Sequence, residues 1–156
     1  MIASALPWWP TRNGIAIRFR LTPRSSKEAV EGIEPTADGP AFTAPTDAVA
    51  DGAGVTVLES GSGRLLKYAP DGALLARIAE EPPLLDRARG LGSDGQGKLW
   101  VANTPGGRVV AFDGQGNLVQ EIPVWPGEDA QPADVQVGLD GRIFVTDPAR
   151  ARLVRF

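Results

Sequence analysis

The chain contains no cysteine and no histidine. Without cysteine it has neither disulfide bonds nor thiol chemistry, and its redox compartment stays open. Without histidine it lacks the commonest general base and the commonest transition-metal ligand. A serine–histidine triad, a zinc hydrolase and a histidine-dependent nuclease are therefore excluded for this chain alone. Carboxylate chemistry and oxygen-ligated cations remain open.

Long apolar runs and a strong net charge are missing as well. No stretch reaches the roughly 18 apolar residues that a membrane span requires. The opening, MIASALPWWP, is apolar but lacks a basic region and a clear cleavage site. We interpret it as mature sequence and not as a signal peptide, which favours a cytoplasmic location. The net charge of −3 argues against a nucleic-acid binder. We expect neither a membrane nor a nucleic acid as a partner.

What the sequence does contain is glycine and proline, 19 and 14 of its 156 residues. This abundance indicates many tight turns, and so short β-strands. An internal repeat follows from residue 51: DGAGVTVLESGSGRLLKYAPDGALLARI is followed by DGQGKLWVANTPGGRVVAFDGQGNLVQEI and then by DGRIFVTDPARARLVRF. A period of 43–44 residues fits a unit of about four strands, as in propeller blades.

The first two copies align with one inserted residue. Val57 falls on Trp100, so that Ser60 falls on Asn103, and the insertion then places Arg64 on Arg108. The third copy follows at a constant shift of 44 residues without a gap.

The repeats, of which ARGLGSDGQGKLWVANTPGGRVVAFDGQGNL is the clearest, resemble NHL-type β-propeller blades and the related gluconolactonase-like and virginiamycin-lyase-like propellers. The resemblance implies a mainly β fold over residues 43–156, built from antiparallel four-stranded blades at about 45–87, 88–131 and 132–156. Two blades are full and the third is partial, so one chain does not close a ring. The chain could assemble with copies of itself, pack its N-terminal strand onto an edge, or be part of a longer protein.

Residues 1–42 have a different character. Their pattern PWW, NGIAIRFRLTPRSSKEAVEGIE and DG resembles the start of the bacterial YggU-like family, whose function is uncharacterised. The later part of that family's domain has no counterpart here. Alternating apolar residues predict a half-buried strand over 15–21, and SSKEAVEGI is either a short helical turn or a loop. We expect a short β or α+β segment.

Five aspartates precede glycine and raise the question of a calcium loop: Asp51, Asp71, Asp94, Asp113 and Asp140. A calcium loop needs about six converging oxygen ligands, and none of these tetrapeptides offers more than one acid. Asp-Gly suits the positive φ of hairpin turns, so we interpret them as structural turns. Calcium or another divalent cation is conceivable as a cofactor, but no motif supports one and we assign no metal site.

Two further positions recur once in each repeat. Ser60, Asn103 and Asp147 are predicted to cap the turn that follows them, with a ligand site as the alternative. Arg64, Arg108 and Arg152 are predicted to bond neighbouring strands, with an anion-binding face as the alternative. The C-terminal arginines form either a weak anion-attracting patch or simply the edge of the incomplete repeat: Arg142, Arg150, Arg152 and Arg155.

The loop PVWPGEDAQP does not repeat, and inter-blade loops open on the propeller face where ligands usually dock. We therefore predict a binding surface at Trp125, Glu128, Asp129 and Asp134, with Asn103 and Asp147 as further candidates. The sequence favours a non-enzymatic binding or interaction module, with a protein partner or self-association and with a small molecule still open. The alternatives are a fragment of a divalent-cation-dependent lactonase- or lyase-like enzyme, and an uncharacterised YggU-like protein.

Overall fold

A computed structural model describes residues 8–11, 14–17, 42–80, 84, 85 and 87–156. In this part of the chain strands dominate, and the single helical element is a three-residue 3₁₀ turn, η1 (Pro148–Arg150). The mainly β prediction is confirmed. Within the same residues no helix is long and apolar enough to cross a membrane. The chain divides into two compact units, Met1–Thr43 and Ala44–Phe156.

In the first unit the structure describes one antiparallel hairpin. Strand β1 (Trp8–Thr11) pairs with β2 (Gly14–Ile17), so that Trp8 lies opposite Ile17. The strand predicted over 15–21 is present in its first half. Its second half and the segment SSKEAVEGI lie outside the described residues.

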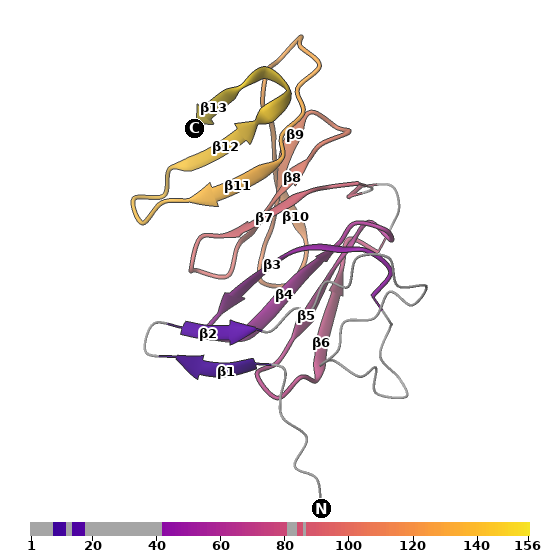
Figure 1. Ribbon diagram of the computed structural model, residues 1–156, viewed down its shortest axis with the longest axis vertical. Helices are drawn as coiled ribbons and strands as arrows, with labels where there is room; N and C mark the ends of the chain where they lie inside the picture. The colour runs from indigo at the N-terminus through magenta and orange to yellow at the C-terminus, as the bar shows by residue number, and fades with distance from the viewer. Residues whose placement is uncertain (1–7, 12–13, 18–41, 81–83, 86) are drawn as a thin grey trace, which may run out of the picture. The chain divides into compact units, whose positions relative to one another are not determined.

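The second unit contains three antiparallel sheets, which follow one another in chain order (Figure 1). The first sheet is β3 (Pro45–Asp51), β4 (Gly54–Glu59), β5 (Arg64–Tyr68) and β6 (Leu74–Ile78). The second is β7 (Gly90–Ser93), β8 (Leu99–Asn103), β9 (Arg108–Phe112) and β10 (Leu118–Pro123). The third is β11 (Asp134–Val137), β12 (Ile143–Asp147) and β13 (Arg152–Arg155). Each sheet is a meander with its strands in sequence order, so the prediction of two full units and one partial unit is confirmed.

The second sheet is buried on both faces because successive side chains of a strand point to opposite sides. Leu99, Val101 and Val110 pack with Leu58 and Leu65 of the first sheet. On the opposite face, an equivalent layer packs against the third sheet and contains Trp100, Ala102, Val109, Val135 and Val145. This explains why LWVAN is a continuous apolar run and not an alternating one.

The first strands of the three sheets, β3, β7 and β11, lie side by side. Glycine allows β7 to approach β11 closely. A Cβ atom at Gly90 would stand 2.5 Å from the Cα of Asp134, and one at Gly92 would stand 2.6 Å from the carbonyl oxygen of Val135. Neither position can carry a side chain without moving the backbone. The glycines of the GLGS strand therefore permit the close approach of β7 to β11.

The meander gives every sheet two distinct ends. We define the loop end as the end at which β3, β7 and β11 begin and at which β4, β8 and β12 end. The connections between sheets also reach this end. The opposite end, the turn end, carries the hairpin turns that join the first strand of each sheet to its second strand.

Candidate binding surface at the loop end

The Asp-Gly turns all lie at the turn end, and they are structural. In each, a carboxylate oxygen accepts a hydrogen bond from the backbone N–H two residues later; examples are Asp51 with Ala53 at 2.7 Å and Asp71 with Ala73 at 3.0 Å. The same bond forms at Asp94, Asp113 and Asp140. Glycines with positive φ complete the turns, as at Gly72 with a φ of 89°. The interpretation of these sequences as turns is confirmed.

The register of the strands corrects the alignment of the first two repeats. Arg64 lies opposite Glu59, Arg108 lies opposite Asn103, and Arg152 lies opposite Asp147. Glu59, and not Ser60, is therefore the equivalent of Asn103 and Asp147. The one-residue difference falls in the hairpin turn that follows Asp51, and from Val55 onward the shift is 44 residues. This position was missed because an insertion can be placed anywhere between two matching residues in a sequence alignment.

The three equivalent polar residues are fully or almost fully buried: Glu59, Asn103 and Asp147. Glu59 Oε1 accepts a hydrogen bond from the N–H of Ala44. Asn103 donates from its amide to the carbonyl of Leu84, and Asp147 Oδ2 accepts from the N–H of Gln131 at 3.1 Å. Each partner lies in the segment that leads into the first strand of the same sheet. These bonds thus link the second strand of each sheet to that segment. Asp147 makes no side-chain hydrogen bond that caps the turn following it.

The repeated arginines do not share one role. Arg64 Nε lies 3.9 Å from Glu59 Oε2, across the strand pair as predicted. Arg108 Nε instead meets Glu121 of β10 at 3.2 Å, and Arg152 Nη1 meets Glu128 at 3.4 Å. The prediction that these arginines bond neighbouring strands thus holds for the first two, while the third turns to the loop between the second and third sheets.

That loop contains the predicted site residue Trp125 and is held in place by its apolar residues. Val124 and Ala130 are each 2% exposed and pack between the second and third sheets, where the half-buried ring of Trp125 joins them. The N–H of Glu128 donates to the carbonyl of Trp125 at 3.0 Å, closing a turn at Gly127. The indole is therefore held in place by this packing.

The indole also meets a charged group. The guanidinium carbon of Arg152 lies 4.8 Å from the ring centroid of Trp125. Glu128 Oε2 lies 3.6 Å from Arg150 Nε, and Arg150 Nη1 lies 3.4 Å from Asp147 Oδ2. Acids and arginines alternate in space, so the group is close to neutral. We call this set of five residues the Trp125 cluster: Trp125, Glu128, Asp147, Arg150 and Arg152.

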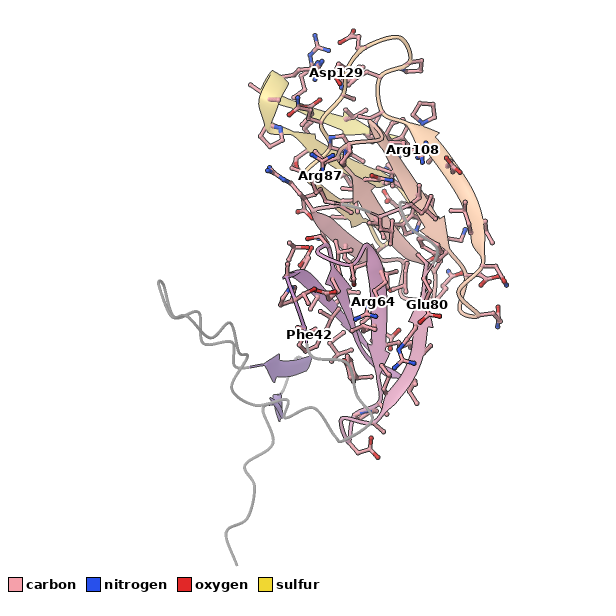
Figure 2. All side chains as sticks on the ribbon, turned by 90° about the vertical axis from the view of Figure 1, so that its right-hand side faces the viewer. Phe42, Arg64, Glu80, Arg87, Arg108 and Asp129 are labelled. Atoms are coloured by element: carbon pink, nitrogen blue, oxygen red, sulfur yellow. The ribbon has the colours of Figure 1, made fainter. Side chains whose placement is uncertain are left out.

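The remaining predicted residues lie elsewhere. Asp129 is exposed on the loop between β10 and β11, outside the three sheets (Figure 2). Asp134 is in β11, where its Oδ1 accepts the N–H of Val135 at 2.8 Å. Asn103 is buried and engaged with backbone. The structure thus brings Trp125, Glu128 and Asp147 together, and it adds Arg150 and Arg152, for which the sequence predicts a structural role or the edge of the incomplete repeat.

Asp134 has an equivalent that sequence reasoning missed. Asp47 lies opposite Leu58 and Asp134 lies opposite Thr146, which are matching positions of the first and third sheets. Asp47 Oδ1 accepts from the N–H of Ala48, and its Oδ2 accepts from the N–H of Leu91 at 2.8 Å. The shared signal is Pro-x-Asp, present in both PTD and PAD.

Burial raises the pKa of Asp47 above its ordinary value. The hydrogen bonds from Leu91 and Ala48 act in the opposite direction, and the charge of Asp134 raises the pKa further. Two carboxylates therefore influence one another across the first strands at the loop end. Among the described residues, no three acidic side chains come together as a metal site would require.

Solved structures share this arrangement of sheets. No protein-family model matches the sequence. Virginiamycin B lyase from Staphylococcus aureus, as a catalytically inactive histidine-to-alanine variant with quinupristin, matches with a TM-score of 0.60, 14% identity and coverage of 78% of this chain and 43% of its own. A calcium-binding regucalcin from Agrobacterium tumefaciens matches with a TM-score of 0.54 and 23% identity, over 68% of this chain and 38% of its own.

A third match is the Pan2 WD40 domain of Neurospora crassa, with a TM-score of 0.51, 18% identity and coverage of 91% of this chain and 42% of its own. At these identities the similarity shows the fold alone. Ala44–Phe156 is a run of β-propeller sheets, as the repeats predicted. The chain spans 38–43% of the length of these three solved structures.

Proposed function

We propose that the chain is a non-enzymatic binding module of NHL-type propeller repeats and that the Trp125 cluster is the surface that contacts a protein partner. Residues 43–156 are proposed to act as one domain whose blades are the three sheets. The observation that carries the proposal is the stacked pair of Trp125 and Arg152 on a loop that does not repeat. Tryptophan and arginine are the residue types most enriched where binding energy concentrates.

The surroundings of the pair support the proposal. The ring of Trp125 is already fixed by packing against the second and third sheets, so little side-chain entropy is lost when a partner covers it. Glu128 and Arg152 are about half exposed, at 51% and 46% of their side-chain area. They are suited to the polar rim of an interface, while Asp129 extends it on the same loop.

The test is a selection from a random peptide library displayed on phage, followed by affinity measurement with purified chain. Selected peptides should lose at least tenfold in affinity for Trp125→Ala and keep it for Leu118→Ala. Leu118 is a suitable control because it is 41% exposed on β10 and lies outside the cluster. Binders that are indifferent to Trp125→Ala, or an absence of binders, would contradict the proposal.

The lyase- or lactonase-like alternative makes a different prediction. The similar virginiamycin B lyase is inactive when one histidine is replaced by alanine, and this chain has no histidine. The carboxylates near the loop end are the groups left for chemistry. Titration calorimetry with Ca²⁺, Mn²⁺ and Zn²⁺ separates the two proposals. Binding of a cation together with opening of a streptogramin B or a lactone would favour the enzyme.

A further inference from the structure

The hairpin turn between β12 and β13 differs from its two equivalents. Each of the three turns has four residues, which are SGSG, TPGG and PARA in chain order. Their third residue is Ser62, Gly106 and Arg150, so a long charged side chain stands in the third turn alone. Arg150 directs its guanidinium to Glu128, on the loop that carries Trp125 and does not repeat either. Two features that the repeat does not require therefore meet in space.

The backbone of this turn is strained at one residue. Ala151 has a φ of 50°, in the left-handed region, where the equivalent residues are Gly63 with 68° and Gly107 with 61°. This conformation is less favourable for alanine than for glycine, because the Cβ atom approaches the following carbonyl oxygen. Arg150 and Arg152 flank the strained residue, and both guanidinium groups reach the carboxylate on the neighbouring loop.

That carboxylate, Glu128, is held loosely. Its Oε2 lies 3.6 Å from Arg150 Nε and 3.4 Å from Arg152 Nη1, which is longer than the about 2.8 Å of a short guanidinium–carboxylate hydrogen bond. The side chain is 51% exposed, so water competes for it. The backbone is fixed separately, because the N–H donates to the carbonyl of Trp125 and the carbonyl accepts from Ala130, both at 3.0 Å. The side chain of Glu128 can therefore leave without movement of the loop.

The rest of the cluster is ordered for an anion once Glu128 turns away. Asp147 Oδ2 accepts the N–H of Gln131 at 3.1 Å and lies 3.4 Å from Arg150 Nη1, which holds this guanidinium in place. The ring of Trp125 orients the guanidinium of Arg152. Two arginines and the buried aspartate then sum to a net charge of +1. We propose that Glu128 occupies the position that a carboxylate of the partner takes in the complex.

This inference rests on the proposed function and names the chemistry of the partner. The segment that fits has an acidic residue for the two arginines and an adjacent apolar residue that covers the indole of Trp125. Arg152 lies on the face of β13 where Val154 packs toward the second sheet, so the site does not involve the outer edge of that strand. Because the internal carboxylate must first be displaced, it lowers the affinity of the parent chain for such a segment.

The test uses two capped peptides, GLEFG and GLQFG, which differ only by a carboxylate in place of an amide. Each is titrated to millimolar concentration into ¹⁵N-labelled full chain, with the indole N–H signal of Trp125 as the readout. We expect a saturable shift with GLEFG and about tenfold weaker binding of GLQFG, because hydrogen bonds to a charged acceptor are stronger. Arg150→Ala should bind GLEFG about tenfold more weakly for the same reason. Glu128→Gln should bind GLEFG about fivefold more tightly, because its internal competitor is neutral.

The chain offers a matched control in a second exposed arginine–glutamate pair. Arg77 Nε lies 3.8 Å from Glu80 Oε1, and the two side chains are 41% and 60% exposed. Glu80→Gln and Arg77→Ala should leave the affinity for GLEFG within about twofold of the parent value.

Several outcomes would overturn the inference. These are no saturable shift with GLEFG, equal affinity for the two peptides, no gain in Glu128→Gln, or no loss in Arg150→Ala. Acetate that binds as tightly as GLEFG would show a site for a free carboxylate and not for a protein segment. Library-selected peptides that depend on Trp125 but are indifferent to Glu128→Gln and Arg150→Ala would leave the binding surface standing and reject the carboxylate site alone.

Discussion

Asp47 Oδ2 accepts a hydrogen bond from the backbone N–H of Leu91 at 2.8 Å, and these residues belong to the first strands of two different sheets. The clusters between the sheets consist of apolar side chains, which constrain the separation of the sheets more than their relative shift. A directional bond between β3 and β7 fixes that shift. The same carboxylate also accepts the N–H of Ala48, which holds its orientation.

Replacing Asp47 should therefore cost stability. Asp47→Ala leaves the N–H of Leu91 without its acceptor, and we expect the free energy of unfolding to fall by about 1–3 kcal/mol. Urea denaturation followed by tryptophan fluorescence measures the change. Asp129→Ala is the control because Asp129 is exposed, and it should stay within about 0.5 kcal/mol of the parent chain. Equal losses for the two variants would contradict a specific role for Asp47.

The pH dependence of Asp47 should be opposite to that of Asp113. Burial raises the pKa of Asp47, so its contribution to stability is complete below its unfolded pKa and is lost as the pH rises through its folded pKa. The side-chain hydrogen bond from Asn117, followed by the backbone N–H of the same residue, lowers the pKa of Asp113. Its contribution is present above the unfolded pKa and is lost as the pH falls through the folded pKa.

A carboxyl ¹³C NMR titration observes both residues in one sample. Asp47 should titrate above the ordinary aspartate value and Asp113 below it. The parent chain should also lose stability relative to Asp47→Asn as the pH rises through this window. The reverse order of the two midpoints would show that burial does not dominate at Asp47.

Adding a methyl group at Gly90 should separate β7 from β11. The new Cβ would meet the Cα of Asp134 at 2.5 Å and the carbonyl oxygen of Ala133 at 2.7 Å, and both are backbone atoms that cannot move aside alone. We expect Gly90→Ala to destabilise the chain by about 2–3 kcal/mol. Gly52→Ala is the matched control, since nothing lies within 4 Å of a Cβ there. Thermal unfolding should distinguish the two variants clearly, and similar midpoints would be evidence against close approach of the strands.

Removing the guanidinium of Arg152 that stacks on Trp125 should have a local effect. Arg152→Ala deletes the group that lies 4.8 Å from the ring centroid. We expect the free energy of unfolding to fall by about 0.5–1 kcal/mol, because the site is half exposed. The indole N–H signal of Trp125 should shift in a ¹⁵N correlation spectrum. Arg155→Ala, on the same strand, should leave that signal in place. A signal unmoved by Arg152→Ala would mean that the two side chains are not stacked in solution.

Much of the fold was predictable because its signals are local. Each Asp-Gly turn needs a short acceptor and a positive φ, and both can be recognised within four residues. The alternation and the repeat period then place the strands between the turns. The one-residue error at Ser60 arose because both Glu59 and Ser60 are polar and follow an apolar strand, and only pairing with Arg64 distinguishes them.

The candidate surface was less predictable because it depends on contacts between distant residues. Trp125 was identified as the aromatic residue that does not repeat, yet nothing in PVWPGEDAQP indicates that Arg152 covers it. The arginine was assigned to the repeat, where its two equivalents do pair with neighbouring strands. Asp134 was grouped with the loop by sequence proximity, whereas β11 places it on the first strand beside Gly90.

The glycines of β7 have a consequence for curvature. Where the first strands touch, the sheets cannot stack as parallel plates, because their first strands are nearer than side chains would allow. The distance between neighbouring sheets must then increase from their first strands toward their outer strands. The size of residues 90 and 92 therefore limits how closely β7 approaches β11, and with it the angle between the second and third sheets.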